Sequence, residues 1–86
     1  MSVAVTTIVC ASPADGVRLS QVLARPGSWS GTMPSIEGNG ALVTLTWSLP
    51  VSTTAIQAAV AAAKPAVMTA VSVTHTAAGA VTAFRF

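Results

Sequence analysis

The chain has 86 residues, of which 52% are hydrophobic and only 7% are charged, and its formal net charge at pH 7 is +2. An ordinary soluble domain has roughly 25% charged residues, so this chain, a single small domain (residues 1–86), cannot cover a free surface with charges of mixed sign. The four basic residues are scattered rather than clustered, and nucleic-acid binding is therefore not expected.

No leader or membrane segment is expected. Residues 1–11 are apolar and β-branched, but no Lys or Arg precedes them, which does not fit a signal peptide. Residues 38–63 and 65–84 contain no formal charge. Pro50 and Pro65 would nevertheless interrupt an apolar helix of about 20 residues.

The first predicted strand comprises residues 2–10 (SVAVTTIVC). Successive residues of a strand point to opposite faces of the sheet. Val5 and Val9, at odd positions, point to one face, and Ile8 and Cys10, at even positions, point to the other. Both faces are therefore apolar, which is typical of a central strand.

A helix is predicted directly after this strand. Ser12 is the expected N-cap, Pro13 the first helical residue and Asp15 the acid of a capping box. Arg25-Pro26-Gly27 ends the helix. Its inward stripe comprises Leu19, Val22 and Leu23.

Residues 28–40 predict an irregular segment or an edge strand, because Pro34 disfavours a central strand. Gly38-Asn39-Gly40 is the predicted hairpin turn, since Gly and Asn tolerate positive φ. It leads into residues 41–49 (ALVTLTWSL), whose alternation of apolar and polar side chains predicts a half-buried strand near the middle of a sheet. Trp47 is the largest side chain that this strand is expected to bury.

A second helix is predicted in the Ala-rich stretch that follows. Ser52, Thr53 and Thr54 offer N-caps, and the spacing of Thr54 and Gln57 fits a capping box. Lys64-Pro65 ends this helix, because the residue before a proline avoids the helical region. The inward stripe comprises Ile56, Ala59, Val60 and Ala63.

Two strands complete the chain, residues 67–76 and residues 80–86, joined by a turn at Ala77-Ala78-Gly79. The second strand places its two phenylalanines on one face and Arg85 on the other. In the strand predicted at residues 67–76, one face is expected to carry Val67, Val71, Val73 and His75.

The predicted order is strand, helix, strand, strand, helix, strand, strand. A βαββαβ core of this kind typically forms the ferredoxin-like α+β fold, an antiparallel sheet with both helices on one face, and the last hairpin adds a C-terminal strand at one edge. The other face of the sheet has no helix to cover it and is the expected docking surface. Its expected side chains are Thr, Ser and Ala residues together with Ile8, Leu42 and Met68.

Cys10 and His75 are the residues to weigh for nucleophilic catalysis. Cys10 precedes a helix N-terminus, which lowers the pKa of a thiol, and as the one cysteine it cannot form an internal disulfide. Neighbouring antiparallel strands would separate Cys10 from His75 by about eight residues, or roughly 26 Å. We therefore expect a buried thiol and a histidine at a strand end, and no enzyme.

No other combination of residues predicts a cofactor or a metal site. One cysteine, one histidine and two distant acids do not supply three or four metal ligands. Asp15 is expected in a helix start and Glu37 in a turn, which excludes paired-carboxylate chemistry. Gly38-Asn39-Gly40 precedes a strand rather than a helix, so it is not a phosphate-binding loop. No small-molecule substrate is expected.

The remaining kind of functional site is a surface that contacts another protein. Trp29 lies in a polar, Gly-rich stretch, where an exposed tryptophan would anchor a contact and a buried one would belong to the core. The interface candidates are Trp29, Met33, Leu42, Met68 and Phe86.

The shortage of charge and the strands rich in Ala, Thr, Val and Ser predict a non-enzymatic structural subunit of a large symmetric assembly. In composition the chain resembles small virion proteins, such as capsid, decoration, connector or tail subunits of tailed phages. From Gly38 to Ala63 it is also similar to bacterial microcompartment shell proteins, which share the βαββαβ layout, a Gly-rich turn before a strand and an Ala-rich helix.

The expected partners are therefore copies of the chain itself or other structural proteins, and the expected location is the virion. The alternative is a small ferredoxin-like regulatory or ligand-binding module in the cytoplasm. Such a module would use the uncovered sheet face for one ligand or one partner, and its surface should carry more charge than this one.

Overall fold

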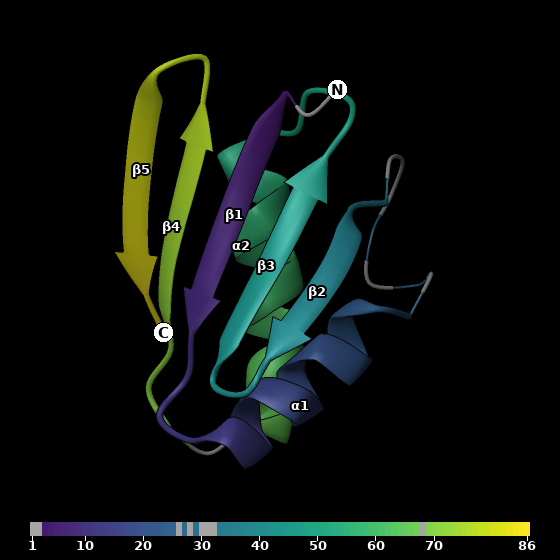
Figure 1. Ribbon diagram of the computed structural model, residues 1–86, viewed down its shortest axis with the longest axis vertical. Coiled ribbons are helices and arrows are strands. Elements are labelled where there is room, and N and C mark those ends of the chain that lie inside the picture. The colour runs from purple at the N-terminus through teal and green to yellow at the C-terminus, as the bar shows by residue number, and fades with distance from the viewer. Residues whose placement is uncertain (1–2, 26, 28, 30–32, 68) are drawn as a thin grey trace.

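A computed structural model describes residues 3–25, 27, 29, 33–67 and 69–86 of the chain (Figure 1). Its elements, in order, are β1 (Ala4–Val9), α1 (Pro13–Leu23), β2 (Ser35–Asn39), β3 (Leu42–Trp47), α2 (Thr53–Ala63), the short 3₁₀ helix η2 (Lys64–Ala66), β4 (Ser72–Ala77) and β5 (Ala80–Arg85).

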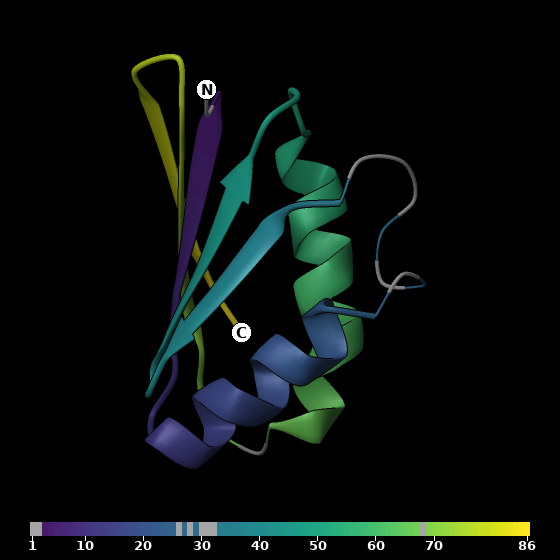
Figure 2. The ribbon, with the colours of Figure 1, turned by 45° about the vertical axis from the view of Figure 1, so that its right-hand side comes forward.

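The five strands form one sheet in the order β2-β3-β1-β4-β5, and every neighbouring pair is antiparallel. β1 is the central strand, β3 lies beside it, and β5 is one edge. Both helices lie on the same side of the sheet (Figure 2). The predicted α+β class, with two helices and an antiparallel sheet, is confirmed.

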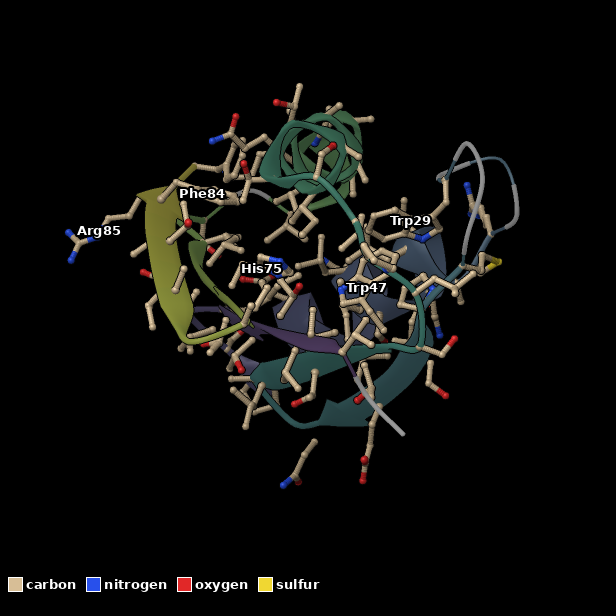
Figure 3. All side chains as sticks on the ribbon, turned by 90° about the horizontal axis from the view of Figure 1, so that it is seen from above. Trp29, Trp47, His75, Phe84 and Arg85 are labelled. Atoms are coloured by element: carbon tan, nitrogen blue, oxygen red, sulfur yellow. The ribbon has the colours of Figure 1, made fainter. Side chains whose placement is uncertain are left out.

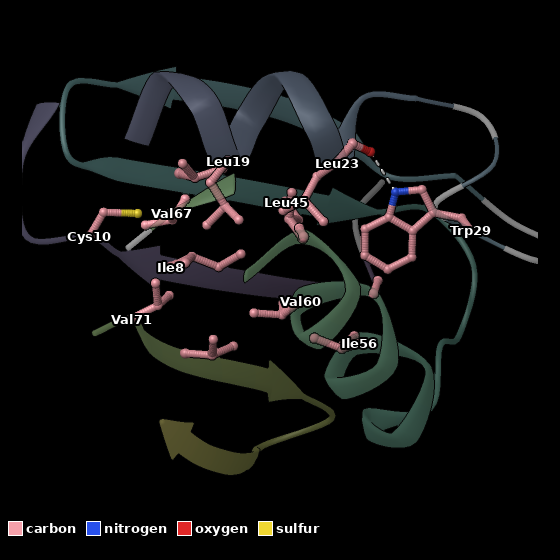
Figure 4. Close-up of a cluster of buried hydrophobic side chains, with 14 of the residues drawn as sticks. Ile8, Cys10, Leu19, Leu23, Trp29, Leu45, Ile56, Val60, Val67 and Val71 are labelled. Carbon is pink, nitrogen blue, oxygen red and sulfur yellow. Dashed lines mark hydrogen bonds between the residues drawn. The ribbon is translucent and has the colours of Figure 1, made fainter. Parts of the chain in front are cut away.

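The core lies between the sheet and the helices (Figure 4). The alternation predicted for β3 is confirmed, because Val43, Leu45 and Trp47 are buried while the residues between them are at least partly exposed. The inward stripe predicted for α2 is buried as well. In α1, Leu19 and Leu23 are buried and Val22 packs at the border of the core.

Each helix begins at a serine cap. Oγ of Ser12 accepts a hydrogen bond from the backbone N–H of Asp15, and Pro13 is the first helical residue, as predicted. For α2 the predicted capping box at Thr54 is wrong. Oγ of Ser52, another of the expected N-caps, instead accepts from the N–H of Ala55, because α2 begins at Thr53, two residues earlier than a Thr54 cap would place it. A serine in this position satisfies an N–H that has no partner within the helix.

Both hairpins have two-residue turns. Gly38 and Asn39 belong to β2, so the predicted turn is displaced, and the actual turn residues are Gly40, with φ of 62°, and Ala41. Between β4 and β5, Ala78 and Gly79 both have positive φ. Positive φ at both positions fits the type I′ turn, whose twist matches that of the flanking strands.

The strand predicted at residues 67–76 begins only at Ser72, because η2 and the residues after it carry the chain back to the sheet. Val67 and Val71 are nevertheless buried, on the same side as Val73 and His75, as their alternation in the sequence predicts. Val71 and Phe86 exchange two backbone hydrogen bonds, at 3.0 and 2.9 Å, which extend the pairing of β4 with β5 by one residue pair.

Candidate functional site

We call the sheet surface opposite the two helices the open face; Figure 1 looks onto it. Strand register and the alternating exposure of side chains show which residues it carries. They are Val3, Val5, Thr7 and Val9 on or just before β1, Ser35, Glu37 and Asn39 on β2, Leu42, Thr44 and Thr46 on β3, Ser72, Thr74 and Thr76 on β4, and Val81, Ala83 and Arg85 on β5. At β5, Arg85 points away from the helices and Phe84 points toward them (Figure 3).

Exposed apolar side chains concentrate on the open face. Single exposed apolar residues are normal on a protein surface, whereas several on one face make that face a candidate contact surface. Eight large hydrophobic residues are exposed in the described part of the chain, and five of them lie on this face. These five are Val3, Val5, Val9, Leu42 and Val81.

Threonines fill the centre of the open face. Thr44, Thr7 and Thr74 lie directly opposite one another across β3, β1 and β4. Cross-strand pairs of β-branched side chains stabilise a sheet. They also present methyl and hydroxyl groups without a charge, so the centre of the face can be covered by another protein without burying an ion.

The charges of the open face lie only at its edges. Glu37 is on edge strand β2 and Arg85 is on edge strand β5. The other four charged residues lie in, or directly after, the two helices; they are Asp15, Arg18, Arg25 and Lys64.

A hollow of about 360 Å³ lies along the β4–β5 hairpin. It is lined by Ser72, Val73, Thr74, Ala83, Phe84 and Arg85, and four of these six residues belong to the open face by register. The hollow exists beside Arg85 because Ser72, Thr74 and Ala83 have short side chains.

One expectation about this face is wrong. Ile8 is 0% exposed and lies in the core, because β1 turns its valines, not Ile8 and Cys10, toward the open face. Leu42 is 37% exposed on the open face, as expected. Met68 lies outside the described residues. When a central strand has apolar residues on both of its faces, the sequence does not indicate which face meets the helices.

The remaining interface candidates do not gather with Leu42. Trp29 is buried, and its indole Nε1 donates a hydrogen bond to the carbonyl oxygen of Leu23 at 2.7 Å (Figure 4). Met33 is 39% exposed just before β2. Phe86 is half-buried and meets Phe84 edge to face, with ring centroids 5.6 Å apart.

The structure does not bring Cys10 and His75 together, but their expected separation is wrong. His75 lies opposite Thr6, only four residues before Cys10 along β1, so the two are roughly 13 Å apart along the strand. Cys10 is a buried thiol, as expected, and the following helix does not lower its pKa: burial, and then the nearby carboxylate of Asp15, raise the pKa of this thiol. A thiol with a raised pKa and no adjacent base is a poor nucleophile.

His75 instead belongs to a buried polar cluster that sequence reasoning missed. Oγ1 of Thr6 accepts a hydrogen bond from Nε1 of Trp47 at 2.9 Å and lies 2.7 Å from Nδ1 of His75. Nε2 of His75 is buried and has no partner among the described residues. Burial lowers the pKa of His75, because a charged ring would lose its hydration there.

Two other features, a metal centre and a membrane-spanning helix, are absent from the described residues. No three Cys, His, Asp or Glu side chains there come together as the ligands of a metal ion would. Neither helix in that part of the chain is both long enough and apolar enough to cross a bilayer.

Comparison with known proteins finds no relative. No protein-family model matches the sequence, and neither the curated proteins nor the solved structures contain a match.

Proposed function

We propose that this chain is a non-enzymatic structural subunit that functions by packing against other protein in a symmetric assembly. The observation that carries this proposal is the open face. It gathers five exposed apolar side chains around uncharged threonines, and its charges lie only at its two edges. Protein interfaces typically have few charged residues at their centre and a polar, charged rim, and the open face has the same distribution of charge.

The arrangement of the titratable groups supports a role without catalysis. Cys10 is buried with a raised pKa, and His75 is buried with a lowered pKa. Asp15 accepts a hydrogen bond from Oγ1 of Thr69 at 2.5 Å and lies 4.0 Å from Arg18, so it fixes the start of α1. Cys10 and His75 are thus enclosed in the fold, and Asp15 is hydrogen-bonded within the chain.

Composition supports a small virion protein as the class of assembly, whether capsid, decoration, connector or tail subunit. The partners are then copies of this chain or other structural proteins, and the location is the virion. With only 7% charged residues, such a subunit would be kept soluble by its neighbours rather than by its own surface.

We further propose that the fold is an elaborated ferredoxin-like one. The strands β4, β1, β3 and β2 are adjacent in that order, and the helices follow β1 and β3 in the chain. β5 then extends the sheet beyond β4. This arrangement supports a βαββαβ core with an added strand.

The hollow on the β4–β5 hairpin favours a second candidate, a small cytoplasmic regulatory or ligand-binding module. At about 360 Å³ the hollow has the size of a small ligand site. Its lining lacks a cluster of converging polar groups beyond Arg85, Ser72 and Thr74, which is why the assembly role ranks first.

Sedimentation velocity over a concentration series, at low and moderate salt, tests the proposal. We expect oligomers whose population grows with concentration, with electron microscopy showing a regular assembly. A protein that stays monomeric at every concentration, and that retains no partner in a pull-down, would contradict it. A monomer or simple dimer that binds a small ligand at the β4–β5 hollow would favour the second candidate.

A further inference from the structure

We propose that a second copy of this chain covers the open face, related to the first by a two-fold axis parallel to β1, so that the two sheets stack face to face. This inference rests on the proposed function, because it names the partner and the geometry of the same surface. Three properties of the face carry it: the symmetry of the strand order about β1, the position of the hollow, and the separation of the two charges.

The strand order makes the face suited to this axis. β1 is central, with β3 and β2 on one side and β4 and β5 on the other. A half-turn about an axis parallel to β1 therefore places β1 over its own copy, β3 over the second copy's β4, and β2 over its β5. Positions along the strands are unchanged by the rotation. Val5 and Val9 then meet their own counterparts at the centre of the interface.

The same rotation brings an apolar side chain to the hollow. Leu42 lies in the same row across the sheet as Val9, Ser72 and Arg85. Since β3 lies over the second copy's β4, Leu42 is placed above that copy's Ser72. Ser72 lines the hollow, so the largest apolar side chain on the face faces the space available for it. The symmetry repeats this contact twice.

The two charges of the face are placed to pair across this interface. Because β2 lies over β5 of the second copy, Glu37 of each subunit faces the edge that carries Arg85. Their rows differ by two residues, roughly 7 Å along the strands, which the long side chain of arginine can span. An axis perpendicular to β1 would place β2 over β2 and would bring like charges together, which is unfavourable.

The available area sets the expected affinity. Five strands spaced about 4.8 Å apart, each about six residues long, give a flat area of roughly 500 Å² per subunit. The total of roughly 1,000 Å² is at the low end for a specific interface. We therefore expect a dimer that forms and dissociates with concentration, rather than an obligate one.

A substitution that places a charge at the centre of the open face tests whether this face is the interface. Thr74→Arg places an arginine at an exposed position in the middle of the open face, where it faces apolar and hydroxyl groups in the dimer but water in the monomer. We expect self-association to weaken by roughly ten-fold or more. Gln57→Arg adds the same charge at an exposed position of α2 and should associate like wild type. Circular dichroism and thermal melting show whether each variant is folded.

A charge exchange tests the orientation. In Glu37→Arg both rim charges are positive, and in Arg85→Glu both are negative, so each variant alone should associate roughly two- to ten-fold more weakly than wild type. An equimolar mixture should form heterodimers in excess of the statistical ratio, because every rim pair is then of opposite sign. The orientation itself follows from the single variants, because about an axis perpendicular to β1 each homodimer would pair like rim charges, as wild type does, and neither substitution would weaken association. Native mass spectrometry separates the two homodimers from the heterodimer by mass, and higher salt should reduce the excess.

The possible outcomes separate this inference from the proposed function. Large assemblies that Thr74→Arg leaves intact, or a mixture without heterodimer excess, would overturn the face-to-face dimer while the assembly role stands. A dimer that Thr74→Arg dissociates, but that never grows further, would support the dimer and contradict a larger assembly. A wild-type monomer at every concentration overturns the second copy as the occupant of the face.

Discussion

Thr6 and His75 lie directly opposite each other on β1 and β4, and Oγ1 of Thr6 is 2.7 Å from Nδ1 of His75. With the indole of Trp47, which donates to the same hydroxyl, they form a polar cluster within the apolar layer between sheet and helices. His75 is only 3% exposed. A charge on its ring would be separated from water and would face no carboxylate partner in this cluster.

Stability should therefore fall as the pH drops below about 6.5. Burial lowers the pKa of His75 below its ordinary value of 6.5, so the unfolded chain binds the proton more readily than the folded one. The stabilisation is complete above the unfolded pKa and is lost as pH falls through the lowered folded pKa, with a slope of at most about 1.4 kcal/mol per pH unit. Urea unfolding between about pH 7.5 and pH 5 measures this slope.

His75→Gln is the matched variant for this pH dependence, because it keeps a polar side chain of similar size but cannot titrate. We expect its unfolding free energy to be flatter over the same pH interval, whatever its absolute stability. An equally steep dependence in the variant would show that another group is responsible.

Gly16→Ala should destabilise the fold, although alanine is normally the better helix former. A Cβ at Gly16 would lie 2.0 Å from the carbonyl oxygen of Gly40 in the β2–β3 turn. Either α1 or the turn must move, which should cost about 1–3 kcal/mol. Gly27→Ala is the control, since a Cβ there has no atom within 4 Å. Chemical denaturation compares the two, and a stabilised Gly16→Ala would contradict the close packing.

Trp29→Phe should destabilise the protein by about 1–3 kcal/mol, a loss due mainly to one hydrogen bond. Nε1 of Trp29 donates to the carbonyl of Leu23, the last residue of α1, and the final carbonyls of a helix have no partner within it. The ring also packs edge to face on Trp47, with centroids 4.9 Å apart, and phenylalanine retains part of this contact. If Trp29 were instead a surface anchor, Trp29→Phe would leave the unfolding free energy unchanged.

Cys10 should react slowly with thiol reagents in the folded protein. It is buried, and burial followed by the carboxylate of Asp15 raises its pKa, so little thiolate is present and little of it is accessible. We expect alkylation to accelerate by orders of magnitude in denaturant, measured by mass spectrometry over time. Fast alkylation under native conditions would contradict this placement.

Much of the local structure could be predicted from the sequence because its signals act over a few residues. Ser12 and Pro13 predicted the start of α1, and the alternation in residues 41–49 predicted which side chains of β3 are buried. Phe84 and Arg85 were placed on opposite faces by their parity alone. Each of these depends on the fixed periods of helix and strand, which no distant contact changes.

Only the tertiary structure decided which surface is open. β1 has apolar side chains on both faces, so its sequence suits either orientation. In the fold the helices cover the side that carries Ile8, where Thr6 also meets Trp47 and His75. Trp29 was ambiguous for a similar reason, since its partner is a backbone carbonyl that any sequence supplies. Burial and long-range hydrogen bonds join residues far apart in the chain, and local periodicity contains no information about such pairs.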